Sequence, residues 1–259
     1  MRPGPSQLIE FSRSVRSNAA PADEHLKPYV REELDALSMH FSVCEIQSRM
    51  QLRRPDALAL EYTRTMMGFL LFQPEPKHVA MVGLGGGSLA KFCLRHLPKM
   101  ALVAVEINPH VIALRNAFKV PPDDARFQVV QANGADFVGR TAQRFDVLMV
   151  DAFDVQGMPH ALGAQRFYDD CFDVLQPGGV LVVNLHAGHV QCPLYLGRIR
   201  AAFGAHVLRV DDADGSNSVV FARRGQPLRL AASTLPAKAA VQLRGAFARV
   251  AMAMRDAAA

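Results

Sequence analysis

The sequence predicts an α/β protein whose mostly parallel, doubly wound sheet carries helices on both faces, preceded by a short β element. Between residues 78 and 203, short apolar runs alternate with helix-like segments, the pattern of repeated βαβ units. These runs are nearly continuous in apolar residues, which is typical of strands buried on both faces. Two further runs, joined by a turn at Asp214-Gly215, predict a closing hairpin and hence an antiparallel last strand.

Residues before this region are expected to form two smaller parts. Residues 1–25 are rich in Pro, Ser, Arg and Ala and lack periodicity, so we expect a flexible arm. Residues 26–76 are expected to form a small N-terminal element. Within it, partial alternation over 37–52 predicts one or two strands, and the apolar positions over 57–72 predict a helix that ends before a Pro-rich turn.

Residues 77–225 are expected to form the main nucleoside-binding domain, and residues 226–259 a linker with an Ala-rich helix over 239–253. In the main domain, each strand is predicted by an apolar run and each helix by an amphipathic segment between two strands. The expected strands are 78–82, 101–105, 127–130, 145–150, 180–185, 206–210 and 218–222, and the expected helices are 89–97, 108–118, 165–175 and 194–203.

Length and composition restrict the class of protein. A chain of 259 residues suits one large α/β domain with a small appendage. The sequence contains no apolar run long enough to span a membrane and no signal-like N-terminus. Its four cysteines form no Cys-x-x-Cys pair, so we expect neither a disulfide framework nor a metal site, and we expect a cytoplasmic location.

The net charge of +5 is carried by scattered arginines. No block of five like charges occurs in the sequence. The pattern therefore favours a solvated basic surface over a nucleic-acid interface.

A glycine cluster follows the first strand of the main domain. Gly83, Gly85, Gly86 and Gly87 lie where the chain turns from that strand into a helix, and such glycines let the backbone approach a ligand closely. Glu106 ends the next strand, 19 residues beyond Gly87. A carboxylate at this place can accept both ribose hydroxyls of a nucleoside. The pattern predicts a nucleoside site, but by itself suits NAD as well as S-adenosylmethionine.

Polar residues also end the third and fourth strands. Asn133 and Gly134 follow the third strand, where an amide can contact adenine. Asp151 and Asp154 follow the fourth, and ligands of such sheets gather at the carboxyl ends of strands. Two carboxylates three residues apart are suited to binding and deprotonating a cationic amine. Helix capping and a plain surface loop are the alternative interpretations.

Five segments together give the sequence a specific resemblance. They are Val82-Gly-Leu-Gly-Gly-Gly-Ser-Leu89, Val105-Glu-Ile-Asn-Pro109, Ala132-Asn-Gly-Ala-Asp-Phe137, Phe145-Asp-Val-Leu-Met-Val-Asp-Ala-Phe-Asp154 and Arg166-Phe-Tyr-Asp-Asp-Cys171. Over residues 44–222 the chain resembles the spermidine synthase family, the polyamine aminopropyltransferases, whose fold is a Rossmann-like, methyltransferase-type sheet.

The resemblance implies a role for each matching residue. Asp151 matches the proton acceptor and Asp154 the residue that holds the amine, while Glu61 lies near a glutamine of the family and is expected to bind substrate. Glu106 matches the ribose-binding acid, and Asn133 an aspartate that contacts adenine. The implied co-substrate is decarboxylated S-adenosylmethionine, without a metal, and the implied partners are a small amine such as putrescine and a second copy in a homodimer.

Two departures from the family pattern stand out. The glycine loop of the family carries an aspartate that binds the primary amine of decarboxylated S-adenosylmethionine, and here that position is Gly86. The N-terminal β element is also shorter than in many members of the family.

Two other functions stay open at this stage. Gly86 favours a methyltransferase that uses ordinary S-adenosylmethionine on a small molecule or RNA, because no acid there would repel the carboxylate of that molecule. A catalytically silent nucleoside-binding protein would also keep the glycine loop and Glu106. NAD-dependent oxidoreduction is disfavoured, because an Asp-x-x-Asp after the fourth strand has no role in hydride transfer.

Overall fold

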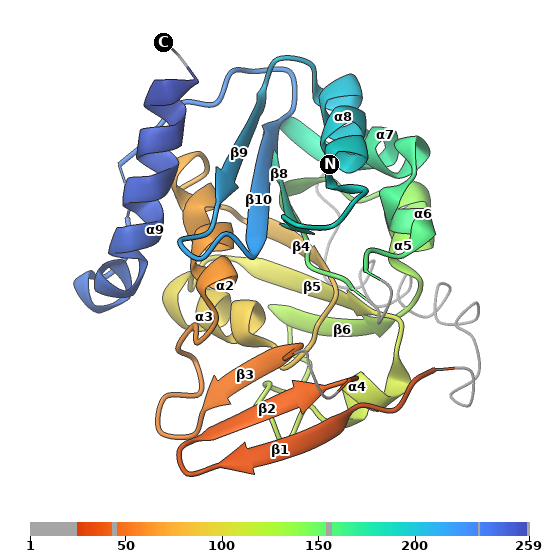
Figure 1. Cartoon of the computed structure of the whole chain (residues 1–259), viewed down its shortest axis with the longest axis vertical. Helices are drawn as coiled ribbons and strands as arrows, with labels where there is room; N and C mark the ends of the chain where they lie inside the picture. The colour runs from red at the N-terminus through yellow and green to blue at the C-terminus, as the bar shows by residue number, and fades with distance from the viewer. Residues whose placement is uncertain (1–24, 43–45, 154–156, 233, 258–259) are drawn as a thin grey trace.

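The main sheet has seven strands in the order β6-β5-β4-β7-β8-β10-β9 (Figure 1). The computed structural model describes residues 25–42, 46–153, 157–232 and 234–257. The strands are β4 (His78–Val82), β5 (Ala101–Glu106), β6 (Phe127–Gln131), β7 (Phe145–Val150), β8 (Leu175–His186), β9 (Val207–Asp211) and β10 (Asn217–Arg223). β4 to β8 pair in parallel and β10 runs antiparallel to both neighbours, which confirms the predicted fold class.

Helices cover both faces of this sheet, with a hydrophobic core under each layer. On one face lie α5 (Gly134–Arg140), α7 (Gln165–Val174) and α8 (Cys192–Phe203). On the other lie α2 (Glu61–Met66), the 3-10 helix η3 (Met67–Leu71), α3 (Ser88–His96) and α9 (Ala237–Asp256). The short helices α4 (Pro109–Ala113) and α6 (His160–Gly163) complete the set that the structure describes. Apolar strands such as β7 are therefore buried on both faces, as their composition predicts.

A second, antiparallel sheet of three strands lies beside the main one, with the order β1 (Tyr29–Glu33), β2 (Ala36–His40) and β3 (Ser48–Gln51). β2 and β3 fall in the predicted β segment. β1 was not expected, because its sequence Tyr-Val-Arg-Glu-Glu has no apolar alternation; every one of its residues is exposed. β1 has no apolar face of its own and is held by antiparallel pairing with the buried β2.

Two predicted helices differ from the structure, and the short helices α5 and α6 were not predicted. The helix expected over 57–72 is divided into α2 and η3. The helix expected over 108–118 ends at Ala113 and is followed by hydrogen-bonded turns. In these turns Phe118 is buried and Lys119 has a φ of 53°. α5 was not expected; it is short, and its start depends on a side-chain cap rather than on periodicity. The domain boundaries proposed near residues 25, 76 and 225 stay predictions.

The strand order indicates where the main sheet binds a ligand. β4 has β5 on one side and β7 on the other, so the chain reverses its winding direction at β4. The loops that follow β4 and β7 leave the sheet at this switch point, where α/β sheets bind their ligands. Both the glycine loop and Asp151 start there.

Candidate active site

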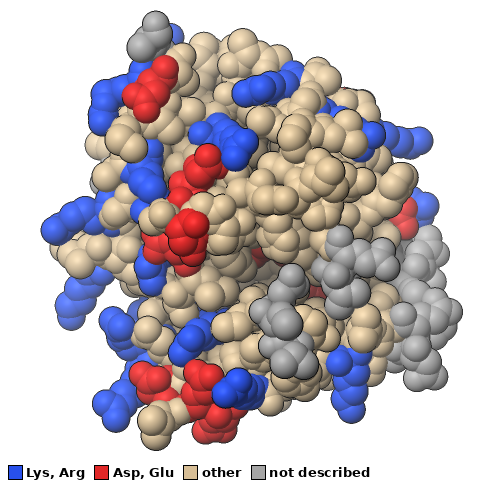
Figure 2. Space-filling model, viewed as in Figure 1, with Lys and Arg blue, Asp and Glu red and all other residues tan. Residues whose placement is uncertain are grey.

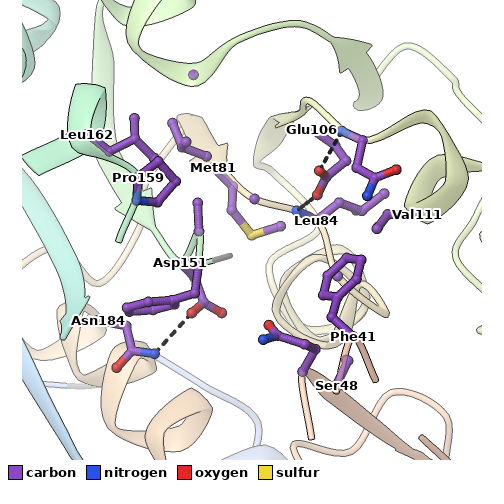
Figure 3. Close-up of a pocket in the computed structure, with 18 of the residues that line it drawn as sticks. Phe41, Ser48, Met81, Leu84, Glu106, Val111, Asp151, Pro159, Leu162 and Asn184 are labelled. Atoms are coloured by element: carbon purple, nitrogen blue, oxygen red, sulfur yellow. Dashed lines mark hydrogen bonds between the residues drawn. The ribbon is translucent and has the colours of Figure 1, made fainter. Parts of the chain in front are cut away.

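A large pocket of about 980 Å³ opens at the carboxyl ends of β4, β5, β7 and β8. The small sheet closes it from the opposite side with Phe41 and Ser48 (Figure 3). This volume lies within the range of ligand sites for molecules of nucleoside size. The pocket therefore has room for a nucleoside together with a second small substrate.

The glycine loop forms one wall of this pocket through Gly83 and Gly85. Gly83 has a φ of +92°, and a Cβ there would lie 2.1 Å from the backbone oxygen of Asp151. Only glycine allows this close approach of the loop to the end of β7. The loop backbone and the Asp151 carboxylate are thus held against each other.

Gly86 and Gly87 lie behind the pocket wall rather than among its described lining. A Cβ at Gly86 would lie 2.6 Å from both the Phe118 ring and the Ser48 hydroxyl. Ser48 of β3 and Phe118, which follows α4, therefore occupy the space that a side chain at position 86 would need. Gly87 has a φ of +67° and precedes the first residue of α3.

Glu106 lies at the end of β5 and is only 9% exposed. One of its carboxylate oxygens accepts the Leu84 N–H and the other accepts the Asn108 N–H, each at 2.9 Å. Burial raises the pKa of Glu106, and these backbone hydrogen bonds act against that rise. The backbone of Gly85 and of Ile107 also hydrogen-bonds this carboxylate and lowers its pKa. Glu106 lines the pocket, and its contact with the ribose stays a prediction.

Asn133 and Gly134 also line the pocket, at the start of α5. The Asn133 side-chain oxygen caps that helix by accepting the N–H groups of Ala135 and Asp136. We therefore expect the amide nitrogen of Asn133, rather than its oxygen, to meet an adenine ring nitrogen.

Asp151 ends β7 beside the glycine loop, and its N–H donates to the Val82 carbonyl at 2.9 Å. Its Oδ1 accepts the Asn184 amide N–H at 3.0 Å (Figure 3), and the Tyr62 hydroxyl also hydrogen-bonds this carboxylate. Burial raises the pKa of Asp151 to about 6, while the bonds from Asn184 and Tyr62 lower it. A carboxyl group tuned in this way can exchange protons near neutral pH.

The two predicted substrate residues differ in what the structure says of them, and only Glu61 is described. Asp154 falls outside the described residues. Glu61 lies in α2, where its carboxylate forms 2.5 Å ion pairs with Arg64 and with Arg249 of α9. Both oxygens of Glu61 are engaged away from the pocket, so the structure does not bring it together with Asp151.

Sequence reasoning missed two residues that contact Asp151. Tyr62 was expected on the apolar face of a helix, and Asn184 inside an apolar strand. Asn184 did leave a signal, because it is the single amide in the run Val-Leu-Val-Val-Asn-Leu of residues 180–185. Tyr62 left none, since an aromatic residue at a helical apolar position is ordinarily core.

The pocket is acidic although the protein is basic. Glu106 and Asp151 line it, and no Lys or Arg occurs among its described lining residues. On the face shown in Figure 2, Lys and Arg lie among Asp and Glu on the surface. Within the described ranges, no cluster of His, Cys, Asp and Glu could hold a metal ion, and no helix is long and apolar enough to cross a membrane.

Comparison with known proteins shows which family the chain belongs to. Residues 59–195 match the spermine/spermidine synthase domain. A polyamine aminopropyltransferase of Chromobacterium violaceum is 39% identical over 219 residues, which cover 84% of this chain and 82% of that protein.

Two solved structures are similar in fold. A probable spermidine synthase from Corynebacterium glutamicum has a TM-score of 0.69 at 17% identity, and the match covers 89% of this chain and 90% of that one. Human methyltransferase-like protein 13, solved in complex with SAH, has a TM-score of 0.60 at 25% identity, covering 74% of this chain and 92% of that one. These likenesses show the fold, while the domain match and the relative from Chromobacterium violaceum show that the chain belongs to the spermine/spermidine synthase family.

Proposed function

We propose that this protein is a polyamine aminopropyltransferase, which moves an aminopropyl group from decarboxylated S-adenosylmethionine to an amine such as putrescine. One observation carries the proposal: the pocket presents two carboxylates and no Lys or Arg among its described lining residues, in a protein of net charge +5. A sulfonium nucleoside and an alkylammonium ion are both cations, so both are attracted to this pocket. The relatives named polyamine aminopropyltransferase support the same activity.

The nucleoside is assigned to the β4–β5–β6 side of the pocket. Glu106 would accept the two ribose hydroxyls, and the backbone at Gly83 and Gly85 would lie along the nucleoside. Asn133 and Gly134 would meet the adenine ring. This arrangement leaves the sulfonium close to the end of β7, where Asp151 stands.

The amine would react on the Asp151 side. The amine nitrogen attacks the three-carbon arm at the carbon bonded to sulfur. The N–C bond forms as the C–S bond breaks. The electron pair of the C–S bond stays on sulfur and neutralises the sulfonium, which gives methylthioadenosine. The proton lost from nitrogen passes to the Asp151 carboxylate. Tyr62 and Asn184 hold that carboxylate, so little reorganisation is needed when the amine arrives.

The remaining parts of the proposal concern residues and assembly. Asp154 is assigned to the second ammonium group of a diamine, as the family pattern implies. Glu61 is left out of the substrate site, because arginines hold both its oxygens. A homodimer and a cytoplasmic location complete the proposal.

A methyltransferase is the second candidate, and Gly86 is the observation that favours it. Without an acid at position 86, the carboxylate of S-adenosylmethionine meets no repulsion there. No Lys or Arg among the described lining residues attracts that carboxylate either, and this favours the decarboxylated form.

Mass spectrometry of the nucleoside product separates these functions. The protein is incubated with putrescine and either decarboxylated or ordinary S-adenosylmethionine. We expect methylthioadenosine and an aminopropylated amine from the first mixture. Adenosylhomocysteine from the second would establish the methyltransferase instead, and nucleoside binding without any product would establish a silent binding protein.

A further inference from the structure

Asn184 is a polar residue in one of the most buried strands of the protein. It is 2% exposed, and β8 lies between β7 and β10, with Val219 of β10 as its pairing partner. Its neighbours along β8, Val183 and Leu185, are buried and apolar. An amide at such a position loses its hydration on folding and destabilises the fold unless its polar atoms are hydrogen-bonded.

The Asn184 amide is only partly satisfied. Its nitrogen donates to Asp151 Oδ1 at 3.0 Å, whereas its oxygen is buried and has no hydrogen-bond partner in the part of the chain that the structure describes. An aliphatic side chain would avoid that unpaired acceptor. Stability of the fold therefore does not account for an amide here, and the one side-chain hydrogen bond that Asn184 makes within the described residues is to Asp151 (Figure 3).

We propose that Asn184 is a positioning residue that fixes the orientation of the Asp151 carboxylate and keeps it ionised. This inference rests on the proposed aminopropyl transfer, in which Asp151 must be ionised to accept the proton of the amine. A hydrogen bond donated to a carboxylate favours its charged form, and it also restricts rotation of the side chain.

The surroundings of Asp151 explain why such support is needed. Burial acts to protonate this carboxyl group and raises its pKa to about 6, against the two hydrogen bonds it accepts. Tyr62 on α2 is one of its neighbours, and the charge of Asp212 in the β9–β10 turn raises the pKa of that tyrosine. His186, His189 and Glu106 line the same pocket. Loss of the Asn184 bond leaves Tyr62 as the remaining hydrogen-bond donor that lowers this pKa.

The direct test is a titration of Asp151 followed by ¹³C NMR with label in the aspartate carboxyl carbons. Comparison with the Asp151→Asn variant assigns the resonance. Asn184→Leu removes the donor and keeps a branched side chain; Asn184→Ala does the same without extra volume if the leucine variant does not fold. We expect the midpoint near pH 6 to rise by about one pH unit in either variant.

Two further variants sharpen this test. Ser218→Ala removes a partly buried side-chain hydrogen bond to Asp211. Ser218 pairs with Leu185, one register position from Asn184, and its loss should leave the Asp151 titration unchanged. Asn184→Gln keeps an amide and should restore part of the ionisation. An Asp151 titration that is the same in the parental and donor-lacking proteins would overturn the inference.

Kinetics distinguish failure of this inference from failure of the proposed function. If the protein transfers aminopropyl groups, the acid limb of kcat/KM should move upward in Asn184→Leu by the same amount as the NMR midpoint. An unmoved acid limb in an active variant contradicts the role of Asn184 alone. A shifted NMR midpoint in a parental protein that transfers nothing overturns the proposed reaction, while Asn184 keeps its effect on Asp151.

Discussion

Glu106 shows how one buried side chain can serve both the fold and the ligand. It accepts the N–H groups of Leu84 and Asn108 and so ties the glycine loop to the end of β5. Glu106 also lines the pocket, where ribose hydroxyls are expected. The carboxylate therefore links the shape of the loop to nucleoside affinity.

Replacing Glu106 with alanine should weaken methylthioadenosine binding about tenfold to a hundredfold, because a charge-assisted acceptor is worth roughly 1.5–3 kcal/mol. Calorimetry measures the affinity. Asp146→Ala is a matched control, since that carboxylate also accepts two backbone N–H groups, from Lys77 and His78, at the start of β4 and so at the opposite edge of the sheet. Equal affinity of Glu106→Ala and the parental protein would refute the ribose assignment.

Gly86 bears on the choice of co-substrate. With no acid at this position, the amine arm of decarboxylated S-adenosylmethionine lacks that partner and the carboxylate of S-adenosylmethionine lacks a repelling charge. We expect the two dissociation constants, measured by calorimetry, to differ by less than about a hundredfold, roughly 2.7 kcal/mol. A larger preference for the decarboxylated form would show that another residue discriminates between them.

At the scale of elements, side-chain hydrogen bonds join α9 to α2. The match to the synthase domain includes α2 but ends at residue 195, before α9. Arg249 of α9 donates to Glu61 at 2.5 Å and to the Thr65 hydroxyl at 3.1 Å. Because α2 also carries Tyr62, this contact supports one wall of the pocket from outside.

Arg249→Met keeps much of the aliphatic packing and removes the ion pair, so it should lower the free energy of unfolding by about 1–3 kcal/mol. Urea unfolding gives that value, and Arg244→Met, an exposed arginine of the same helix, should change it little. If both variants unfold at the same urea concentration as the parental protein, α9 is not held through Arg249.

The elements also show what could be predicted from the sequence. Apolar runs predicted every strand of the main sheet, and the glycine spacing with Glu106 predicted one side of the pocket, because these depend on local pattern. The start of α5 depends on a side-chain cap, and β1 depends on pairing with β2. Tyr62 and Asn184 meet Asp151 from distant parts of the chain, and Glu61 turns away because of Arg249, which lies 188 positions later. Such contacts require the assembled fold.

At the scale of the whole molecule, burial of Asp151 makes the free energy of unfolding depend on pH. The pKa of Asp151 is raised from 3.8 to about 6, so the folded state holds this proton more tightly than the unfolded chain. Tighter binding of this proton adds to the free energy of unfolding below pH 4, and that contribution is lost as the pH rises through 6.

The unfolding free energy of Asp151→Asn, relative to the parental protein, should therefore increase between pH 4 and pH 7. Urea unfolding at a series of pH values gives this difference. Asp146→Asn, for which the carboxylate lies outside the pocket, should not show the same increase. A difference for Asp151→Asn that is flat with pH would mean that the carboxylate is not desolvated as described.

Asp151 as the proton acceptor is the central claim, and single-turnover transfer with saturating amine tests it most directly. Asp151→Asn keeps the shape of the side chain and should still bind nucleoside, but its rate of methylthioadenosine release should fall about 10²–10⁴-fold. The measurement is made from pH 6 to 9, beside the parental protein. Transfer by Asp151→Asn at the parental rate across that range would contradict the mechanism and place the base elsewhere.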